Sequence, residues 1–165
     1  WDSVDFAAGT ISIRQQLQRH EREYIIAPPK NGKPRLILPA PFVMQLLREE
    51  KAAQAEAQLK AGALWENEQG FVFTNQIGQH MKRQTVYKHF KNVVEVIGLP
   101  SVRFHDLRHS YAVAAIRAGD DLKTVSENLG HASVSFTLDV YGHVTSDMRK
   151  SSADKMQNYI AALQA

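Results

Sequence analysis

A chain of 165 residues, 44% of them hydrophobic, is long enough to form one compact domain around a hydrophobic core. The absence of cysteine excludes disulfides and thiolate metal ligands, and no apolar run is long enough to span a bilayer. The formal net charge is only +3, but six Lys and Arg against two Asp and Glu lie between His80 and His109. This local excess of positive charge suits either a nucleic-acid backbone or an ordinary solvated surface. The first residues lack the pattern of a signal peptide, so we expect a cytoplasmic protein with no membrane segment.

The first forty residues predict a small antiparallel sheet, because three short β-favouring runs are separated by polar and turn-forming residues. These runs span residues 9–16, 23–29 and 34–40. Asn31-Gly32, between the last two runs, is a strong hairpin signal because both central turn positions need a positive φ. Lys30 and Lys33 are therefore expected at or beside a hairpin tip.

From Pro41 onward the apolar residues follow helical spacing, interrupted by a connection and a short extended segment at residues 71–75. Gly119 and Gly130 are expected to end two of the helices, and Asp120 or Asp121 to cap the helix between them. The predicted helices span residues 41–59, 85–97, 105–118, 122–129 and about 146–163. The sequence thus predicts a mainly α fold with a small antiparallel β-sheet, an α+β class, in a single domain.

The helix expected to begin at His105 has an unusually polar first turn. His105 and Arg108 share one helical face at a terminus whose free N–H groups attract an anion such as phosphate, although the same residues could simply hydrate an exposed helix start. His105 and His109 also have the i, i+4 spacing of a helical zinc pair. The intervening Arg108 would repel a metal cation, and the glutamate of a zinc protease is absent. We therefore expect no metal and no other cofactor.

Further along the chain, His131 follows Gly130, and Tyr141 lies ten residues later. Together with His105 and Arg108 they form an ordered set: H-x-x-R, then L-G-H, then T-x-x-x-Y. This set resembles the signature of the catalytic domain of the tyrosine recombinases, the phage integrase family, and the match runs along all of residues 105–144. The resemblance implies an enzyme of site-specific DNA recombination, as found in integrases of mobile elements.

The resemblance extends toward the N-terminus. Family members carry a catalytic lysine at a hairpin tip, which implies Lys30, with Lys33 as the second candidate, because Arg35 matches the basic residue that follows the turn. The opening "WDSVDF" resembles the segment that follows the helix of the first catalytic arginine. By this match residues 1–165 are a single catalytic domain that lacks this arginine helix and the N-terminal DNA-binding domain. We expect such a fragment to be inactive or weakly active alone.

The resemblance also implies a role for each site residue. Tyr141 would attack a DNA phosphodiester to form a 3′-phosphotyrosine intermediate, and Arg108 would stabilise the negative charge on the phosphate. His105 would hydrogen-bond the same phosphate or take the tyrosine proton, and His131 would donate to a non-bridging oxygen. Lys30 would protonate the leaving 5′-oxygen.

The expected partner is double-stranded DNA, bound by a homotetramer of a bacterial or phage-encoded protein that is a monomer when free. The last helix carries an apolar stripe that either docks on a neighbouring protomer or folds back on its own core, and we expect the second. The stripe consists of Met148, Met156, Ile160 and Leu163. Two other interpretations stay open: a non-catalytic DNA-binding module with the same fold, and a metal hydrolase that uses His105, His109 and His131.

Overall fold

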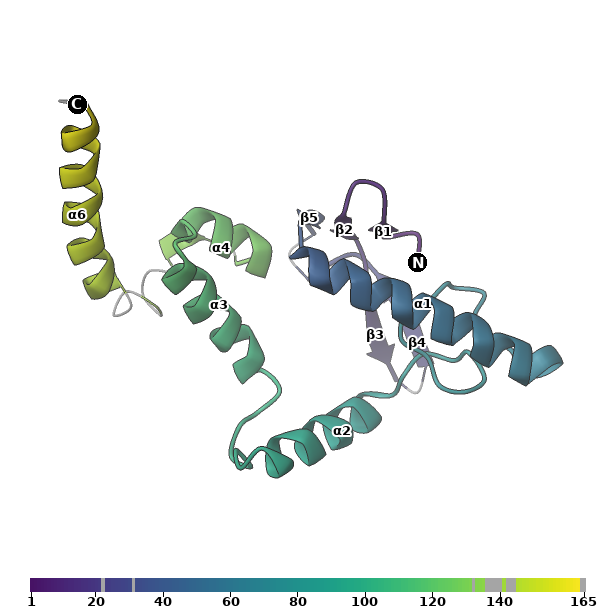
Figure 1. Cartoon of the computed structure of the whole chain (residues 1–165). Helices are drawn as coiled ribbons and strands as arrows, with labels where there is room; N and C mark the ends of the chain where they lie inside the picture. Colours follow the sequence, from purple (N-terminus) through teal and green to yellow (C-terminus); the bar gives the residue numbers. More distant parts are fainter. Residues whose placement is uncertain (22, 31, 132, 136–140, 142–144, 164–165) are drawn as a thin grey trace. The chain divides into compact units, whose positions relative to one another are not determined.

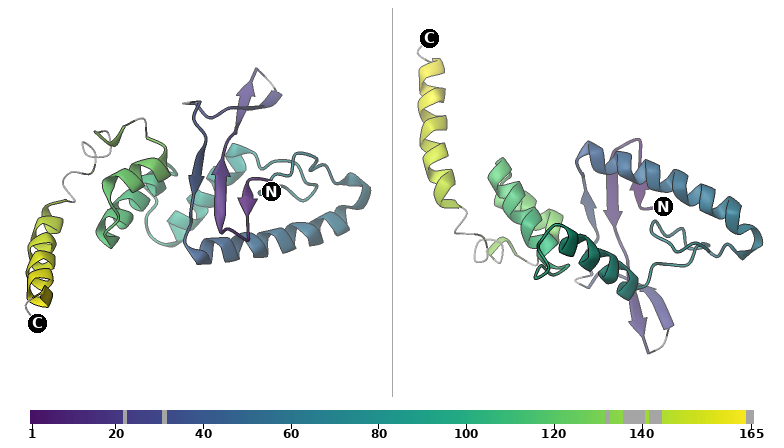
Figure 2. Two further views of the ribbon diagram at one scale, coloured as in Figure 1. Left: turned by 90° about the horizontal axis from the view of Figure 1, so that it is seen from above. Right: turned by 60° about the horizontal axis from the view of Figure 1, so that its bottom comes forward.

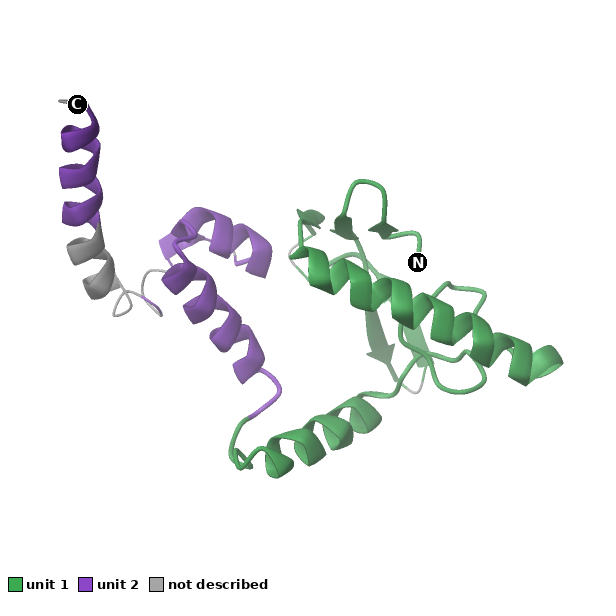
Figure 3. Ribbon diagram, in the orientation of Figure 1, with its two compact units in different colours: residues 1–102 green, residues 103–165 purple. Residues whose placement is uncertain are grey.

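The computed structural model describes residues 1–21, 23–30, 32–131, 133–135, 141 and 145–163, with the side chains of the last helix described from Ser152 onward (Figure 1). These residues form two compact units, unit 1 (residues 1–102) and unit 2 (residues 103–165) (Figure 3). Helices make up about 51% of the described residues, and the described strands pair antiparallel, which confirms the expected α+β class. The single catalytic domain stays a prediction.

Unit 1 contains two small antiparallel sheets. The three-stranded sheet has the order β1-β2-β5, and the other is the hairpin of β3 and β4, which extends beyond the end of the first sheet (Figure 2). In register, Ile11 of β2 faces Ile37 of β5, and Leu17 of β3 faces Ile26 of β4. The strands span Val4–Asp5 (β1), Thr10–Ile13 (β2), Gln16–His20 (β3), Glu23–Ala27 (β4) and Arg35–Ile37 (β5).

The prediction of a hairpin at Asn31-Gly32 is wrong. β4 pairs with β3 rather than with β5, so the turn of the hairpin lies at Glu21, the one described non-glycine residue with a positive φ (54°). Lys30 lies instead in the connection from β4 to β5. Gly32 does adopt a positive φ of 67°, and its N–H donates to the carbonyl of Pro29 at 2.7 Å, but this turn does not join paired strands. Asn31 itself lies outside the described residues.

The helices of unit 1 are α1 (Pro41–Ala61), followed by the short 3₁₀ helix η1 (Gly62–Leu64), and α2 (Arg83–Val96). Pro41 occupies the first turn of α1 as expected, because that turn needs no N–H donor from it. α1 runs across one face of the strands (Figures 1 and 2) and buries Met44 and Leu47. The segment expected to be extended at residues 71–75 contributes one isolated antiparallel bridge, from Thr74 to His80.

Gln54 of α1 organises the connection that follows the helix. Its side chain is buried and donates to the carbonyls of Phe71 and Val72, both at 3.0 Å. Its amide oxygen accepts the indole N–H of Trp1 at 2.6 Å. The network also includes Thr74 Oγ1 and Asn67. Three segments far apart in the sequence are thus held by one amide.

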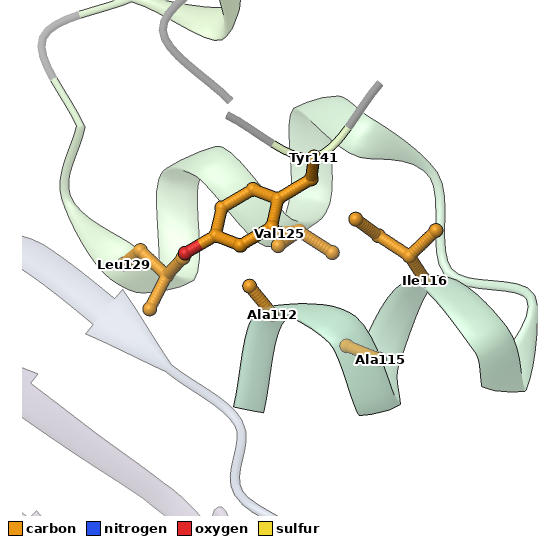
Figure 4. Packing of buried hydrophobic residues seen from close by; sticks show 6 residues of the cluster. All are labelled: Ala112, Ala115, Ile116, Val125, Leu129 and Tyr141. Carbon is orange, nitrogen blue, oxygen red and sulfur yellow. The ribbon is translucent and has the colours of Figure 1, made fainter. Parts of the chain in front are cut away.

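Unit 2 contains α3 (Asp106–Ala118), α4 (Leu122–Leu129) and α6 (Thr145–Leu163). Gly119 ends α3 with a φ of 102°, and the carboxylate of Asp121 caps α4 by accepting the N–H groups of Lys123 and Thr124, both at 3.0 Å. These boundaries confirm the predicted helix ends. The buried cluster of unit 2 is shown in Figure 4 and consists of Ala112, Ala115, Ile116, Val125, Leu129 and Tyr141.

The expectation that the last helix folds back on its core is wrong for the side chains that are described. Met156 is 59% exposed, Ile160 43% and Leu163 69%. Met148, the fourth residue of the predicted stripe, lies outside the described side chains. Within the described ranges no helix is long and apolar enough to cross a membrane.

Candidate active site

The start of α3 is fixed by an ion pair. The carboxylate of Asp106 accepts the backbone N–H of Arg103 at 2.8 Å and also pairs with its guanidinium at 2.8 Å. These hydrogen bonds from Arg103 hold the pKa of the Asp106 carboxyl below its usual range. An acid in the first turn is also favourable for the helix dipole. His105 precedes this turn at the N-cap position and is exposed.

Arg108, one turn into α3, is half-buried and points to the end of α4. Its guanidinium donates to the carbonyl of Leu129 at 2.5 Å. Leu129 is the last residue of α4, and the final carbonyls of a helix lack partners within the helix. The contact therefore satisfies a helix end and at the same time fixes a cation on this side of unit 2.

The L-G-H tripeptide places His131 by a helix-capping motif. Gly130 has a left-handed φ of 68°, which a residue with a Cβ adopts only at a cost. The N–H of His131 then donates to the carbonyl of Ser126 at 3.0 Å, and this bond closes the cap. Burial, and after it the positive charges of Arg108 and His109, lowers the pKa of the His131 imidazole. His131 thus favours the neutral form next to a cationic group.

Tyr141 is part of the core of unit 2 and is also in contact with the polar residues. Its ring lies among Ala112, Val125 and Leu129 and the residue is only 3% exposed (Figure 4). Its hydroxyl lies 2.7 Å from Nδ1 of His109. Burial raises the pKa of the phenol, while the charge of Arg108 acts in the opposite direction. The hydroxyl group therefore lies at the polar edge of an otherwise apolar pocket.

The sequence does not predict the contact of His109 with Tyr141, because the spacing of His109 from His105 indicates only a candidate metal ligand. The centroid of the His109 ring lies 5.3 Å from the centroid of the His105 ring, with the two rings edge to face, and 5.9 Å from the centroid of the Tyr141 ring. A signal was present in the sequence: His109 precedes the buried residues Ala112 and Ile116 by three and seven positions, and so shares their face of α3.

The structure thus brings together Arg108, His109, His131 and Tyr141, with His105 beside His109. Lys30 and Lys33 belong to unit 1, where both are exposed. In the part of the chain that the structure describes, no group of three His, Asp or Glu side chains is arranged to hold a metal ion. The groups that do meet are a cation, imidazoles and a phenol, which together suit nucleophilic attack on a phosphate.

Several curated proteins are similar to the chain over nearly all of its length. A protein described as "Tyrosine recombinase XerC-like" from Caldanaerobacter subterraneus is 29% identical over 96% of this chain and 44% of its own length. The ICEBs1 integrase of Bacillus subtilis is 27% identical over 97% of this chain and 43% of its own length. The chain therefore spans less than half the length of these two relatives.

Solved structures show the same fold. A structure of the Tn1549 transposon integrase with transposon right end DNA matches 94% of the chain with a TM-score of 0.71 at 22% identity, and covers 51% of that protein's chain. The XerA recombinase matches 92% of the chain with a TM-score of 0.64 at 20% identity, over 49% of its own chain. The model of the phage integrase family matches residues 1–148. The chain therefore belongs to the phage integrase family.

Proposed function

We propose that this chain supplies the catalytic part of a tyrosine-type site-specific DNA recombinase, with Tyr141 as the nucleophile. The observation that carries the proposal is the placement of the Tyr141 hydroxyl against His109 and within the field of Arg108. A phenol that is otherwise buried among aliphatic side chains meets, at its hydroxyl, the groups that a phosphoryl transfer needs. The names of the relatives, recombinases and integrases, agree with this assignment.

In the proposed reaction the Tyr141 oxygen gives its proton to an imidazole of the site and attacks the phosphorus of a phosphodiester. A bond from the tyrosine oxygen to phosphorus forms, the bond to the 5′-oxygen breaks, and the 5′-oxygen takes a proton from Lys30. Arg108 stabilises the extra negative charge on the phosphate oxygens, and His105 and His131 donate to the same group. Because the phosphotyrosine link conserves the energy of the broken phosphodiester bond, the 5′-hydroxyl of another strand can attack this link and reverse the step.

Double-stranded DNA is the proposed partner; the Tn1549 integrase was solved with transposon right end DNA, and the XerH recombinase was solved with its palindromic difH substrate. The basic excess between His80 and His109 is suited to contact the phosphate backbone. Assembly into a tetramer on DNA belongs to the same proposal.

The test uses the product of the open reading frame that encodes this chain and a nicked suicide duplex that carries a binding site selected from a random-sequence library. The wild type is expected to form a covalent protein–DNA adduct that survives denaturing electrophoresis, and Tyr141→Phe to form none. Tyr111→Phe is the matched control, because Tyr111 is 43% exposed and its hydroxyl accepts from the side-chain amide of Asn128 at 3.0 Å. DNA binding without any adduct by the wild type would favour the non-catalytic module instead.

The acid role of Lys30 has a separate test on the same duplex. Replacing the leaving 5′-oxygen by sulfur removes the need for an acid, because a thiol has a pKa of about 8.5 and leaves as the thiolate. Lys30→Ala is expected to cleave the ordinary duplex poorly and the sulfur duplex at the wild-type rate. If the sulfur duplex restores the cleavage rate of Lys33→Ala but not that of Lys30→Ala, the acid is Lys33.

A further inference from the structure

The hydroxyl of Tyr141 meets an imidazole to which the resemblance to the recombinases assigns no role. The distance of 2.7 Å between the hydroxyl oxygen and Nδ1 of His109 is that of a good hydrogen bond. Tyr141 is only 3% exposed, and the hydrogen bond itself is partly buried. His109 is therefore well placed to exchange a proton with the phenol.

Both partners of this hydrogen bond lie against the buried cluster of unit 2. His109 lies on the face of α3 that also carries Ala112 and Ile116, two residues with no measurable exposure. On its other side the ring meets His105 edge to face, with the centroids 5.3 Å apart. The Tyr141 ring is packed against α3 and α4. The hydrogen bond therefore exists before any DNA phosphate arrives, which is the preorganisation that a proton acceptor requires.

We infer that His109 is the group that takes the proton of Tyr141 during strand cleavage, and that it returns this proton when the strand is rejoined. In balance, the O–H bond of Tyr141 breaks as the bond from its oxygen to phosphorus forms, and the proton moves to Nδ1 of His109. The leaving 5′-oxygen takes its proton from a different group, so His109 is charged only while the phosphotyrosine exists. This inference rests on the proposed function and adds a catalytic residue to it.

The other groups of the site are less well placed for this transfer. His105 is exposed, and in the described part of the chain its ring contacts His109, which lies between it and Tyr141. His131 is half-buried beside Arg108, whose positive charge opposes protonation of that imidazole. The charged and titratable groups around His109 are His105, Asp106 and Arg108 of α3, and His131 after α4. Arg108 stabilises the phenolate at the moment when His109 accepts the proton.

The first test needs no DNA. An imidazole that accepts a proton at Nδ1 must carry its own proton on Nε2, and the two tautomers have different ¹⁵N shifts. In the labelled 165-residue chain at neutral pH, His109 is expected to be the Nε2–H tautomer, with an Nδ1 resonance that moves in Tyr141→Phe but not in Tyr111→Phe. An Nδ1–H tautomer, or an Nδ1 resonance that ignores Tyr141→Phe, would overturn the inference.

The second test measures cleavage of the suicide duplex by His109→Asn and His109→Leu. The amide oxygen of asparagine can replace Nδ1 as a hydrogen-bond acceptor, but it does not take a proton. If His109 is the base, both variants lose about 10²- to 10⁴-fold in rate at pH 7, and raising the pH to 9 restores much of the loss because hydroxide forms the phenolate. His20→Asn is the matched control, since His20 is exposed on β3 in unit 1.

Three outcomes separate the inference from the proposed function. Near wild-type cleavage by His109→Asn, with a loss only in His109→Leu, would make His109 a positioning residue and overturn the inference. A loss in both variants that does not respond to pH would overturn it as well. Absence of any Tyr141-dependent adduct in the wild type would instead overturn the proposed function. On the duplex with a 5′-sulfur leaving group, His109→Asn is expected to remain slow, because a better leaving group does not replace a missing base.

Discussion

Unit 2 is organised around an apolar cluster that includes the proposed nucleophile, whereas a buried amide, Gln54, ties together distant segments of unit 1. In unit 2 the residues proposed for catalysis are placed by helices, since Arg108 and His109 belong to α3 and His131 follows the cap of α4. In unit 1 the proposed acid, Lys30, lies on an exposed connection between strands. The comparison teaches that packing against a core fixes the proposed catalytic residues of unit 2, whereas the proposed acid of unit 1 belongs to a loop.

The largest effect is expected from Arg108→Ala, which removes both the phosphate-stabilising charge and the donor to the Leu129 carbonyl. Strand cleavage should fall by about 10²- to 10³-fold, and the free energy of unfolding by about 1–2 kcal/mol. Arg108→Lys keeps the positive charge but loses the planar guanidinium. Its cleavage rate is expected to lie between those of the wild type and Arg108→Ala. Adduct formation and chemical denaturation measure the two effects. A normal rate in Arg108→Ala, with Arg117→Ala as the exposed control on the same helix, would contradict the role of α3.

Gln54→Leu is the corresponding change in unit 1. It leaves the carbonyls of Phe71 and Val72 without their donor and the indole of Trp1 without its acceptor, at an expected cost of about 2–3 kcal/mol. Because both tryptophans of the chain, Trp1 and Trp65, lie in unit 1, their fluorescence during urea unfolding reports on that unit.

The exposed Gln45→Leu on α1 is the control for this change and is expected to cost less than about 0.5 kcal/mol. The ¹⁵N resonance of the His109 side chain reports on the unfolding of unit 2 in the same samples. If Gln54→Leu lowers the stability of both units equally, the two would unfold as one, and the contrast between them would concern contacts but not stability.

The two ends of α4 give a matched pair of smaller changes. Asp121→Ala removes the N-cap, and Gly130→Ala places a Cβ at a φ of 68°, so each should cost about 1 kcal/mol of stability. Only the second displaces His131, and we expect a loss of about tenfold or more in cleavage for Gly130→Ala alone. Thermal unfolding and adduct formation are the measurements. Equal losses of activity in the two variants would show that the stability of α4, rather than the position of His131, matters.

The smallest effect is the pH dependence of unit 2. The folded pKa of His131 is lowered, so the unfolded chain binds more protons below about pH 6.5 and stability is lost as the pH falls through that value. We expect the midpoint of urea unfolding, measured from the NMR resonances of Tyr141, to lie at a lower urea concentration at pH 5.5 than at pH 7.5. In His131→Gln the difference should shrink. An unchanged difference would assign the acid sensitivity to other groups.

The sequence predicted the local parts of this structure well and the long-range parts poorly. The ends of α3 and α4 were predictable because Gly119, Asp121 and Gly130 act on neighbouring backbone groups. The hairpin at Asn31 was wrong because strand pairing depends on distant partners, and residues 16–20, which carry no strong β signal, take the place beside β4. The turn at Gly32 was correctly placed, but its strands were not.

The same division holds for the candidate site. The ordered set of His105, Arg108, His131 and Tyr141 was visible in the sequence, and the structure brings three of its members together around His109. The contact of His109 with Tyr141 joins residues that are 32 positions apart, so helix spacing alone did not reveal it. The exposed face of α6 was unpredictable for a related reason, since an apolar stripe does not specify what it packs against.

Leu129 contributes to the site through both its side chain and its main chain. Its side chain is a member of the buried cluster, while its main-chain carbonyl accepts the guanidinium of Arg108. Because every amino acid has this carbonyl, alanine scanning would detect the apolar contribution and miss the anchor of the arginine. Only a change in the backbone itself, such as an ester in place of the peptide bond between residues 129 and 130, would weaken that acceptor and reveal it.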